Sequence, residues 1–387
     1  MQIFHFHLMP YAHIDLQAIR DAGTAWVTLS NKHYDPIKGA DLYNEYLDQM
    51  EFADQLGFAG LVVNEHHQTA YGMMPIPGVM AGALARRIKN GRLAVLGRAL
   101  PLQNNPLQIA EEYAMLDVIT RGKLIAGFVR GIGAEYHTFG VNPAESAGRF
   151  HEAHDLIIQA WTQPGPFSYE GKYYNFKYVN IWPRPYQQPH PPIFVPSSGS
   201  LDTIRWVAQK RYTYCQTLAP FDMVAKTFDL FREEADKAGY ESSPDQLAWS
   251  NAIFVRETDE IALRDVRPHL EAYMNEFLTR DPAMMMPPGY SSVASIKRVR
   301  AMRGYRNVRQ TAEEILAKGI VIVGSPNTVR EKLAAAQDRG KFNISLTKTQ
   351  FGTMPHALVT ENQIAIAEEI LPFFRDRSPQ ALNVAAE

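Results

Sequence analysis

Residues 193–217, with the sequence IFVPSSGSLDTIRWVAQKRYTYCQT, contain the pattern that decides the fold. A short apolar run, Ile193–Val195, is followed by a loop of serine and glycine and then by an amphipathic helical pattern over Leu201–Lys210. A second strand-like run, Tyr212–Thr217, comes directly after this helix. Strand, helix and strand in this order predict two parallel strands joined by a crossover helix.

The same alternation extends through most of the chain. The other expected strands are Ile3–Leu8, Gly60–Val63, Leu93–Ala99, Leu124–Phe128, Ala248–Val255 and Ile344–Thr349. Further helical patterns lie at Tyr43–Leu56, Leu107–Thr120, Phe221–Ala238, Thr258–Phe277 and Thr360–Phe374. Eight strands, each followed by a helix, predict an α/β fold with a single (β/α)8 TIM barrel over residues 1–387. A doubly wound sheet is the competing arrangement, but no G-x-G-x-x-G follows the first strand.

Composition narrows the class of protein. Lys and Arg total 39 against 41 Asp and Glu, which gives a formal net charge of −2 and no basic footprint for nucleic acid. A single cysteine, Cys215, excludes an intramolecular disulfide framework and a cysteine-rich zinc site. The apolar runs are too short for a membrane span, and the N-terminus lacks the pattern of a secretory signal. We therefore expect a cytoplasmic protein that contacts neither nucleic acid nor membrane.

Two stretches exceed a minimal barrel and predict insertions after the fourth and seventh strands. Residues 164–192 are rich in proline and aromatic residues, which predicts a hairpin and an extended strap that bury Tyr173, Tyr174, Phe176 and Trp182. Residues 279–318 include three consecutive methionines and a Pro-Pro-Gly segment. A long irregular insertion late in a barrel is typical of a mobile lid over an active site.

Histidine pairs at two places suggest metal sites but lack further ligands. His5 and His7 alternate on the first strand, so both side chains are able to face the barrel interior, but the later strands offer no third ligand. We interpret His7 instead as a wall residue of a pocket. His151 and His154 are one residue short of the H-E-x-x-H spacing and are interpreted as a helix face. No metal site is predicted.

The segment Asn64–His67 follows the second strand directly. Residues that leave a barrel strand at its carboxyl end lie at the active-site mouth. His66 and His67 are adjacent on an extended segment, so their side chains face opposite ways and cannot both bind one ion. One of the two is therefore a candidate acid or base; a structural histidine is the competing interpretation.

Small residues and an arginine follow the next strands at the same mouth. Arg130 and Gly131 come after the fourth strand, and Pro196–Ser200 leads into the helix after the fifth. Glycine permits close backbone approach, and a helix N-terminus favours an anion. Arg130 with this loop predicts a phosphate site, although an ordinary helix cap explains Ser200 equally well.

Many short motifs in order make the chain resemble the bacterial-luciferase-like family of flavin-dependent monooxygenases. The resemblance extends along the barrel from end to end, and its region from Ile320 onward is similar to the diketocamphane-type Baeyer–Villiger members. The motifs are Glu45, Gly57-Phe58, Glu65-His66-His67, Gly97 to Pro101, Asn105-Pro106, Ala110-Glu111-Glu112, Leu116-Asp117, Gly122-Lys123-Leu124, Arg130-Gly131, Glu135-Tyr136, Phe139-Gly140, Arg149-Phe150, Glu152, Gly171 to Tyr174 and Gly324 to Val329.

The resemblance implies roles for residues at the barrel mouth. His66 aligns with the catalytic histidine of the family, and reduced FMN is the implied cofactor. Gly97 and Arg98 lie where relatives have a cis, bulged peptide under the flavin ring, and an arginine there is unusual. Val129 stands where luciferase itself has a reactive cysteine. The implied cofactor-binding residues are Gly97, Arg98, Val129, Arg130, Gly131, Arg149, Gly199, Ser200 and Thr203.

The implied activity is that of a two-component monooxygenase, in which reduced FMN and O2 oxygenate a small or medium-sized organic substrate through a C4a-peroxyflavin. Such chemistry needs a dry, closable pocket. The chain has no nicotinamide fingerprint, so a separate NAD(P)H:flavin reductase is the expected partner. The resemblance also suggests a homodimer packed through helices near Leu107–Thr120. Two alternatives remain open: a deazaflavin-dependent hydride-transfer enzyme of the same superfamily, and a non-catalytic flavin-binding protein.

Overall fold

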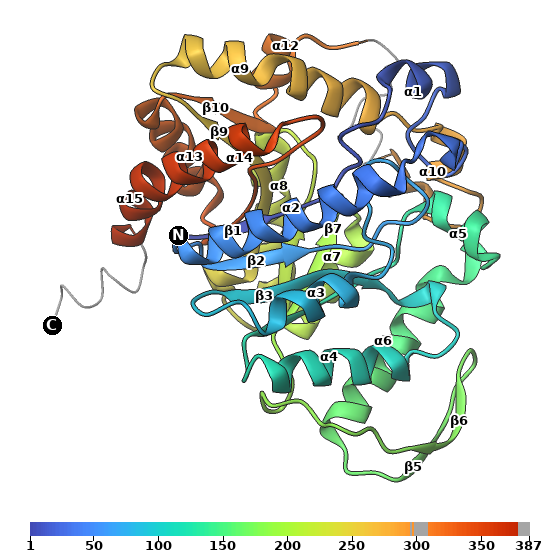
Figure 1. Cartoon of the computed structure of the whole chain (residues 1–387). Helices are drawn as coiled ribbons and strands as arrows, with labels where there is room; N and C mark the ends of the chain where they lie inside the picture. The colour runs from blue at the N-terminus through green and yellow to red at the C-terminus, as the bar shows by residue number, and fades with distance from the viewer. Residues whose placement is uncertain (295, 298–308, 378–387) are drawn as a thin grey trace, which may run out of the picture.

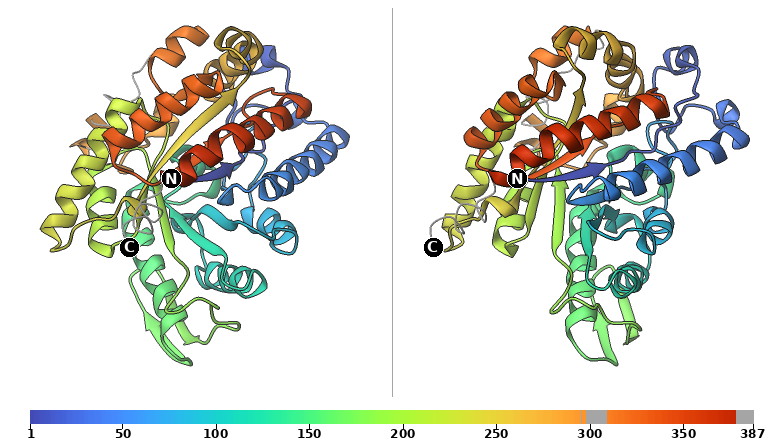
Figure 2. Two further views of the ribbon diagram at one scale, coloured as in Figure 1. Left: turned by 90° about the vertical axis from the view of Figure 1, so that its left-hand side faces the viewer. Right: turned by 60° about the vertical axis from the view of Figure 1, so that its left-hand side comes forward.

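The computed structural model describes residues 1–294, 296–297 and 309–377. Its centre is a closed barrel of parallel strands, with helices packed around it (Figures 1 and 2). β1 pairs with both β2 and β11, and β8 pairs with β9, so the sheet closes on itself. The barrel strands are β1 Gln2–Phe6, β2 Gly60–Val63, β3 Arg92–Ala99, β4 Leu124–Val129, β7 Ile193–Ser197, β8 Thr213–Gln216, β9 Leu247–Val255 and β11 Ile344–Lys348.

This closure confirms the predicted (β/α)8 TIM barrel and excludes the doubly wound sheet. The eight barrel strands are those expected from the sequence, and their ends agree with the expected ends to within two residues. A further strand, β10 Val321–Gly324, is parallel to the second half of β9, with Val321 opposite Ala252. β10 was not expected from the sequence, because a four-residue run next to an irregular insertion carries little periodicity.

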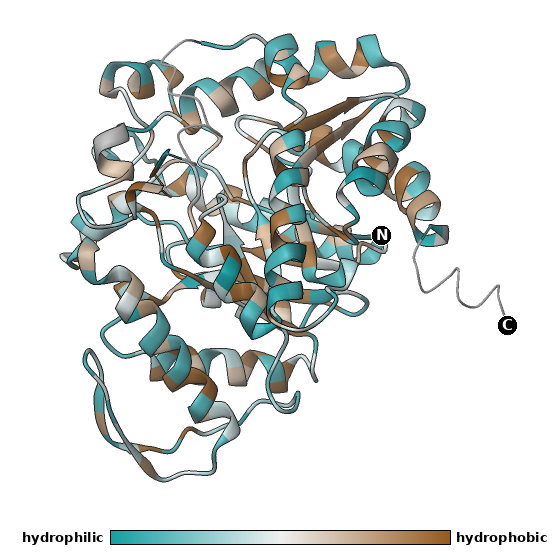
Figure 3. Ribbon diagram, turned by 180° about the vertical axis from the view of Figure 1, so that it is seen from behind, coloured by the Kyte–Doolittle hydropathy of each residue, from teal (hydrophilic) through white to brown (hydrophobic). Residues whose placement is uncertain are grey.

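Helices follow the strands and form the outer layer of the molecule. They are α1 Leu16–Ala22, α2 Pro36–Gln55, α3 Pro77–Ala85, α4 Leu107–Ile119, α5 Gly133–Phe139, α6 Ser146–Thr162, α7 Leu201–Lys210, α8 Phe221–Lys237, α9 Asp259–Ala272, α10 Pro282–Met285, α12 Ala312–Ala317, α13 Pro326–Gly340, α14 His356–Ala365 and α15 Leu371–Asp376. Apolar residues concentrate on the strands and on the inner faces of these helices (Figure 3). None of the helices in the described ranges is long and apolar enough to cross a membrane.

Local sequence sets where several of these helices begin. The Asp35 side chain accepts hydrogen bonds from the Ile37 and Lys38 amides at the start of α2, where Pro36 occupies the first helical position. Ser325 caps α13 in the same way, through the Thr328 amide. These caps fix the residue at which each of the two helices begins.

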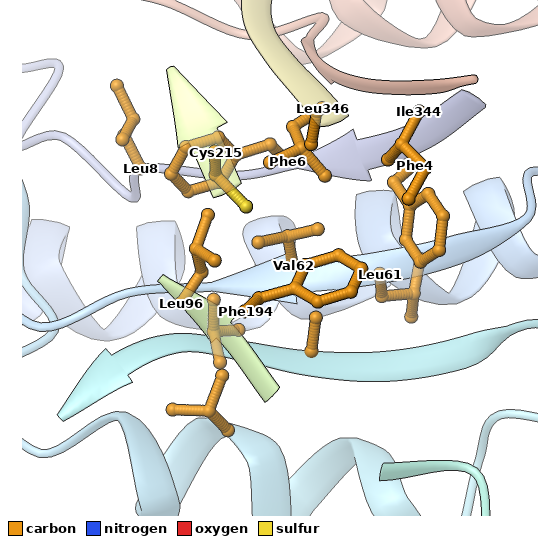
Figure 4. Packing of buried hydrophobic residues seen from close by; sticks show 14 of the residues in the cluster. Phe4, Phe6, Leu8, Leu61, Val62, Leu96, Phe194, Cys215, Ile344 and Leu346 are labelled. Atoms are coloured by element: carbon orange, nitrogen blue, oxygen red, sulfur yellow. The ribbon is translucent and has the colours of Figure 1, made fainter. Parts of the chain in front are cut away.

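The barrel interior is filled by alternate side chains of each strand. Figure 4 shows Phe4, Phe6 and Leu346 among the buried apolar residues there. His5 and His7 lie on the opposite face of β1, toward the helices: His7 Nε2 is 2.9 Å from Gln49 Oε1 of α2. The interpretation of His7 as a pocket wall residue is therefore wrong, because the residues of β1 with odd numbers face outward.

The insertion after β4 contains the predicted hairpin. β5 Phe167–Glu170 and β6 Asn175–Val179 are antiparallel, and they lie outside the barrel beside α6 (Figure 1). The Glu152 carboxylate of α6 accepts the backbone amides of residues 172–174, which ties the hairpin turn to the helix. Tyr174 is buried, but Trp182 is 82% exposed, so the expectation that Trp182 buries its surface is wrong.

Part of the predicted lid lies outside the described residues, since residues 295 and 298–308 belong to the second insertion. The assignment of residues 1–387 to one domain also stays a prediction, because residues 378–387 are outside the described part. The described remainder of the second insertion begins after β9 and returns to the barrel at β10.

One charged side chain lies inside the barrel. Lys348, the last residue of β11, is 3% exposed, and its Nζ donates a hydrogen bond to Ser250 Oγ of β9 at 2.9 Å. The Nζ also lies 5.3 Å from the centre of the Phe6 ring. No carboxylate oxygen within the described residues lies within 4 Å of this amine. Burial lowers the pKa of Lys348 to about 7.

Replacing Lys348 by methionine is expected to stabilise the protein in a pH-dependent way. The unfolded chain keeps this proton up to about pH 10.4, whereas the folded chain releases it near pH 7. Below pH 7 folding therefore buries a charged amine, which costs free energy. This cost falls as the pH rises from 7 toward the pKa of a free lysine. Lys348→Met should raise the melting temperature clearly at pH 6.5 and much less at pH 9.

The exposed Lys226 of α8 supplies the control for this experiment. Lys226→Met should leave the melting temperature nearly unchanged at both pH values. An equal gain for Lys348→Met at pH 6.5 and pH 9 would contradict the pH-dependent cost of burying this amine.

Gly127 is expected to tolerate no side chain. A Cβ at Gly127 would lie 2.1 Å from the Val95 carbonyl oxygen and 2.9 Å from the Leu96 Cα, and both are backbone atoms that cannot move aside. Gly127→Ala should lower the stability by about 2–4 kcal/mol, measured as the shift of the urea midpoint.

Gly82 of α3 is the matched glycine. Its Cβ would meet nothing within 4 Å, and the residue is exposed. Gly82→Ala should leave stability unchanged or raise it by about 0.5–1 kcal/mol, because alanine is the better helix former. Similar losses of stability in Gly127→Ala and Gly82→Ala would show that the close approach of β3 and β4 at Gly127 is not the cause of the loss.

Candidate active site

A cavity of about 1630 Å³ opens at the carboxyl ends of the barrel strands. Side chains at the ends of β1, β4, β7 and β11 line it, together with the loops that follow β2 and β8 and with residues 285–292 of the second insertion. Catalytic and binding groups of TIM barrels lie at this end because the strands deliver their last residues there. This cavity is the candidate active site.

His66 lies on the wall of this cavity. Its ring centre is 5.2 Å from the rings of both Trp26 and Tyr71, which stack on one another at 5.0 Å. The buried Nδ1 has no hydrogen-bond partner, and the nearest acceptor, Glu135 Oε1, lies 3.7 Å away. The imidazole is 21% exposed. His66 thus combines access to the cavity with an acidic neighbour.

Glu65 holds the segment that carries His66. One carboxylate oxygen lies 2.9 Å from His67 Nε2, and the other accepts a hydrogen bond from Arg98 Nη1 at 2.7 Å. Glu65 also accepts the Ala99 amide at 3.4 Å. His67 is turned toward Glu65, and its ring lies 4.6 Å from that of Phe139. As expected for an extended segment, His66 and His67 face different surroundings.

Arg130 occupies another wall, where the described part of the second insertion meets the barrel. Its Nη1 donates to the Tyr290 carbonyl at 2.9 Å, and its guanidinium lies 4.6 Å from the centre of the Tyr290 ring. Ser146 and Ser291 hydroxyls lie 3.5 Å from its terminal nitrogens. The Tyr290 hydroxyl donates to the Gly131 carbonyl at 2.5 Å. The insertion is therefore fastened to both residues after β4.

The loop after β7 brings hydroxyl groups and a helix N-terminus to the same cavity. Ser200 precedes the first residue of α7, and Gly199 has a φ of +98°, a conformation that favours glycine. Ser197 Oγ accepts the amides of Gly199 and Ser200. Ser200 and Thr203 both line the cavity. A helix N-terminus with adjacent hydroxyl groups suits an anion such as phosphate.

Gly97 lies where β3 and β4 approach most closely. A Cβ at Gly97 would be 2.4 Å from the carbonyl carbon of Gly127. The cis peptide bond joins Leu96 to Gly97, and the pairing of β3 with β4 is irregular between Val95 and Arg98. The resemblance implied a cis, bulged peptide at Gly97 and Arg98. The irregular pairing includes these residues, but the cis bond precedes Gly97 and does not follow it.

The predicted site residues, the catalytic His66 and the nine cofactor-binding residues, divide into two groups. His66, Gly97, Val129, Arg130, Gly131, Ser200 and Thr203 line the cavity, whereas Arg98, Arg149 and Gly199 are not among the lining residues. Arg98 is buried in ion pairs with Glu65 and Glu112, and Arg149 donates to the backbone carbonyls of Pro101 and Gln103. The assignment of Arg98 and Arg149 to the cofactor site therefore stays a prediction, and in this structure other protein groups contact both guanidinium groups.

His151 and His154 lie in different surroundings and contact other protein groups. His154 is buried between Asp155 and the Tyr212 hydroxyl, and His151 packs on Trp206 at the cavity wall. Burial lowers the pKa of both His151 and His154. Within the described residues, no group of three or more histidine, cysteine or acidic side chains is placed to hold a metal ion.

Several basic residues of the cavity were not expected from the sequence, among them Lys348 and Arg280. Lys348 reaches the inner end of the cavity from the last barrel strand, and Arg280 enters from the second insertion. The Arg280 guanidinium carbon lies 4.5 Å from the centre of the Trp26 ring. A lysine at the end of an otherwise uncharged strand was a signal for Lys348. Arg280 lies in an irregular segment, so its position could not be read from periodicity.

Two sequence relatives match the chain over different shares of its length. An uncharacterised protein of Sinorhizobium fredii, y4wF, is 26% identical over 86% of this chain and 93% of its own length. The oxygenase component of the flavin-dependent trigonelline monooxygenase of Acinetobacter baylyi is 31% identical over 40% of this chain and 43% of its own.

Solved structures with the same fold cover nearly the whole chain. The monooxygenase RslO1 from Streptomyces bottropensis matches with a TM-score of 0.73 at 24% identity, over 97% of this chain and all of its own. The oxygenating constituent of 3,6-diketocamphane monooxygenase from Pseudomonas putida, in complex with FMN, has a TM-score of 0.71 at 21% identity, with 86% and 93% covered. The coenzyme F420-dependent tetrahydromethanopterin reductase of Methanopyrus kandleri has a TM-score of 0.61 at 17% identity, with 86% and 96% covered.

The family model described as luciferase-like monooxygenase matches residues 24–341, which span the barrel from the loop after α1 to the end of α13. This match includes the candidate site residues from His66 to Thr203 and the second insertion. The chain therefore belongs to the luciferase-like monooxygenase family.

Proposed function

We propose that this chain is the oxygenase component of a two-component monooxygenase that uses reduced FMN and O2 to oxygenate a small or medium-sized organic substrate. The observation that carries the proposal is the placement of two groups on one cavity. His66 lies among aromatic side chains, and Arg130 lines the same cavity as Ser200 and Thr203 at the N-terminus of α7. The relative from Acinetobacter baylyi, described as an oxygenase component, supports the division into two components.

The residues present suit FMN. Arg130, Ser200 and Thr203 supply a guanidinium, hydroxyl groups and the first turn of a helix to one region of the cavity wall. These are donor groups that bind a terminal phosphate. The cavity volume of about 1630 Å³ accommodates a flavin together with a second small molecule.

Reduced FMN, when bound, supplies the two electrons that activate O2. The protein's own contribution is to hold the phosphate with Arg130, to exclude water, and to manage a proton with His66. Glu135 Oε1 lies 3.7 Å from His66 Nδ1 and gives the imidazole an acidic neighbour. Trp26 and Tyr71 pack against the imidazole and keep bulk water from it.

The remaining expected partners follow from the same proposal. Reduced FMN must come from a separate NAD(P)H:flavin reductase, and O2 is the second co-substrate. We also propose a homodimer, since α4 exposes Met115, Val118 and Ile119 to solvent and α3 exposes Val79. A cluster of exposed apolar side chains favours contact with another protein surface.

The proposal is tested first by anaerobic titration with reduced FMN, followed by mixing with oxygenated buffer. We expect saturable binding, and flavin reoxidation with a time course different from that of free reduced FMN. The same titration with reduced F420 tests the deazaflavin alternative. This alternative stays open because an F420-dependent reductase has the same fold. Binding of FMN without any change in reoxidation would indicate a non-catalytic flavin protein, and no binding of reduced FMN would refute the proposal.

Removing the Arg130 guanidinium is expected to weaken FMN binding through the phosphate. Arg130→Ala should raise the Kd for FMN about 10- to 100-fold, the range of a lost charged hydrogen bond. The Kd for riboflavin, which has no phosphate, should change by about twofold or less. Equal losses for FMN and riboflavin would contradict a phosphate contact.

Arg149 provides the matched control for Arg130. Its guanidinium donates to Pro101 and Gln103 carbonyls away from the cavity wall. Arg149→Lys should therefore leave the Kd for FMN unchanged. A loss of FMN affinity in this variant, with the fold intact by circular dichroism, would return Arg149 to the cofactor site.

Replacing His66 is expected to separate binding from chemistry. His66→Ala should bind reduced FMN within about twofold of the unmodified protein but lower product formation by about a hundredfold, the scale of a lost acid or base. Product is measured by mass spectrometry on substrates found in a panel of aldehydes and cyclic ketones. The exposed His137 of α5 is the control, and His137→Ala should keep full turnover. Unchanged turnover in His66→Ala would remove the catalytic role.

A further inference from the structure

Arg280 is a cation in the cavity wall without a carboxylate partner. Its guanidinium carbon lies 4.5 Å from the centre of the Trp26 ring and 5.7 Å from that of Tyr71. Its Nε is buried and makes no hydrogen bond. No carboxylate oxygen in residues 1–294, 296–297 and 309–377 lies within 4 Å of this side chain. An arginine remains charged in such a place, so burying it unpaired is costly.

The nearby carboxylates are engaged elsewhere. Glu135 accepts the Ile132 amide at 2.7 Å and the His67 amide at 3.3 Å, and it faces His66 Nδ1. Glu276 is held by Arg20 at 3.0 Å and by Arg309 at 2.6 Å. Both arginines line the cavity too. Asp281, the next residue in the chain, also lines the cavity, but none of its carboxylate oxygens lies within 4 Å of an Arg280 nitrogen, so within the described residues no carboxylate contacts the Arg280 guanidinium.

Arg280 lies at the same aromatic pair as His66. The His66 ring centre is 5.2 Å from the Trp26 ring, and the Arg280 guanidinium lies 4.5 Å from it. Arg130, by contrast, contacts Tyr290, Ser146 and Ser291. Arg280 and Arg130 thus belong to different surroundings. Arg280 is placed beside the proposed reaction centre, and Arg130 is placed at the proposed phosphate site.

We propose that Arg280 binds a carboxylate group of the organic substrate and thereby holds the substrate beside His66. A guanidinium stacked on an indole ring keeps its N–H edge available for a carboxylate, which it binds through two parallel hydrogen bonds. The contact of the guanidinium with the Trp26 ring holds the group in place before the substrate arrives. The apolar side chains of Phe6, Leu8 and Leu96 line the cavity and suit the rest of an organic acid. The role of Arg280 in positioning a substrate for reaction rests on the proposed function, whereas the binding of a carboxylate by Arg280 does not.

The test measures binding to the flavin-free protein by isothermal titration calorimetry. The probes are benzoate, phenylacetate and octanoate, each compared with its uncharged amide of nearly equal shape. At least one acid should bind about tenfold or more tightly than its amide, as expected for a charged hydrogen bond. Arg280→Gln should abolish this preference, and Arg280→Lys, which keeps the charge but not the planar fork, should retain part of it.

Arg130→Ala distinguishes the two anion sites. The preference for acids should persist in this variant if Arg280 is responsible, and it should disappear if the acids bind at the phosphate site. The Kd for reduced FMN should be the same in Arg280→Gln and in the unmodified protein. A preference that survives in Arg280→Gln, equal binding of every acid and its amide, or no binding of any probe would overturn the inference.

Failure of the proposed function gives a different pattern. Selective binding of acids through Arg280 without any binding of reduced FMN would leave the carboxylate site in place and refute the flavin chemistry. Normal FMN binding and altered reoxidation, without selectivity for acids, would refute the carboxylate site alone. Melting temperatures of the Arg280 variants identify any loss of folding before binding is compared.

Discussion

Each strand of the closed barrel must send alternate side chains to the interior and to the helices, and this constraint decides which polar groups reach the cavity. On β1 it directs Phe6 inward and His7 toward Gln49 of α2. On β11 it directs Lys348 inward, while Thr349, just past its end, lies 3.1 Å from His5 Nδ1. Since the sheet pairs its own backbone groups, the chemistry of the cavity depends on a few such inward residues and on the loops after the strands.

The loop after β2 shows how a buried ion pair positions a functional group. Glu65 binds His67 on one oxygen and Arg98 on the other, so its carboxylate joins the ends of β2 and β3. Removing one partner of a buried pair leaves the other charge unpaired, which makes this connection hard to replace. The segment is thereby held extended, and His66 faces Trp26 and the cavity. Arg98 holds Glu65 in place through the ion pair but does not itself line the cavity.

Charge in the cavity is distributed over separate walls. Arg130 lies near α7 and is contacted by the Tyr290 carbonyl, whereas Arg280 lies on the aromatic pair beside His66. Both contacts involve the second insertion, which supplies Tyr290 to one wall and Arg280 to the other. A site for two anions, one on the cofactor and one on the substrate, needs such separation because two like charges repel in a poorly solvated cavity.

The sequence by itself determined the barrel, because strand and helix periodicities repeat along the chain and each requires only local information. It also placed His66 and Arg130 at strand ends, where the fold requires functional residues. Only the tertiary structure decided the direction in which Arg98 and Arg149 point. Arg98 forms an ion pair with Glu65, and Arg149 donates to the Pro101 carbonyl, and both partners are distant in sequence. The same is true of Arg280, whose position depends on how an irregular insertion packs on Trp26 and Tyr71. Periodicity shows where a strand ends, but which side chains meet across the cavity depends on long-range packing, and no local pattern encodes it.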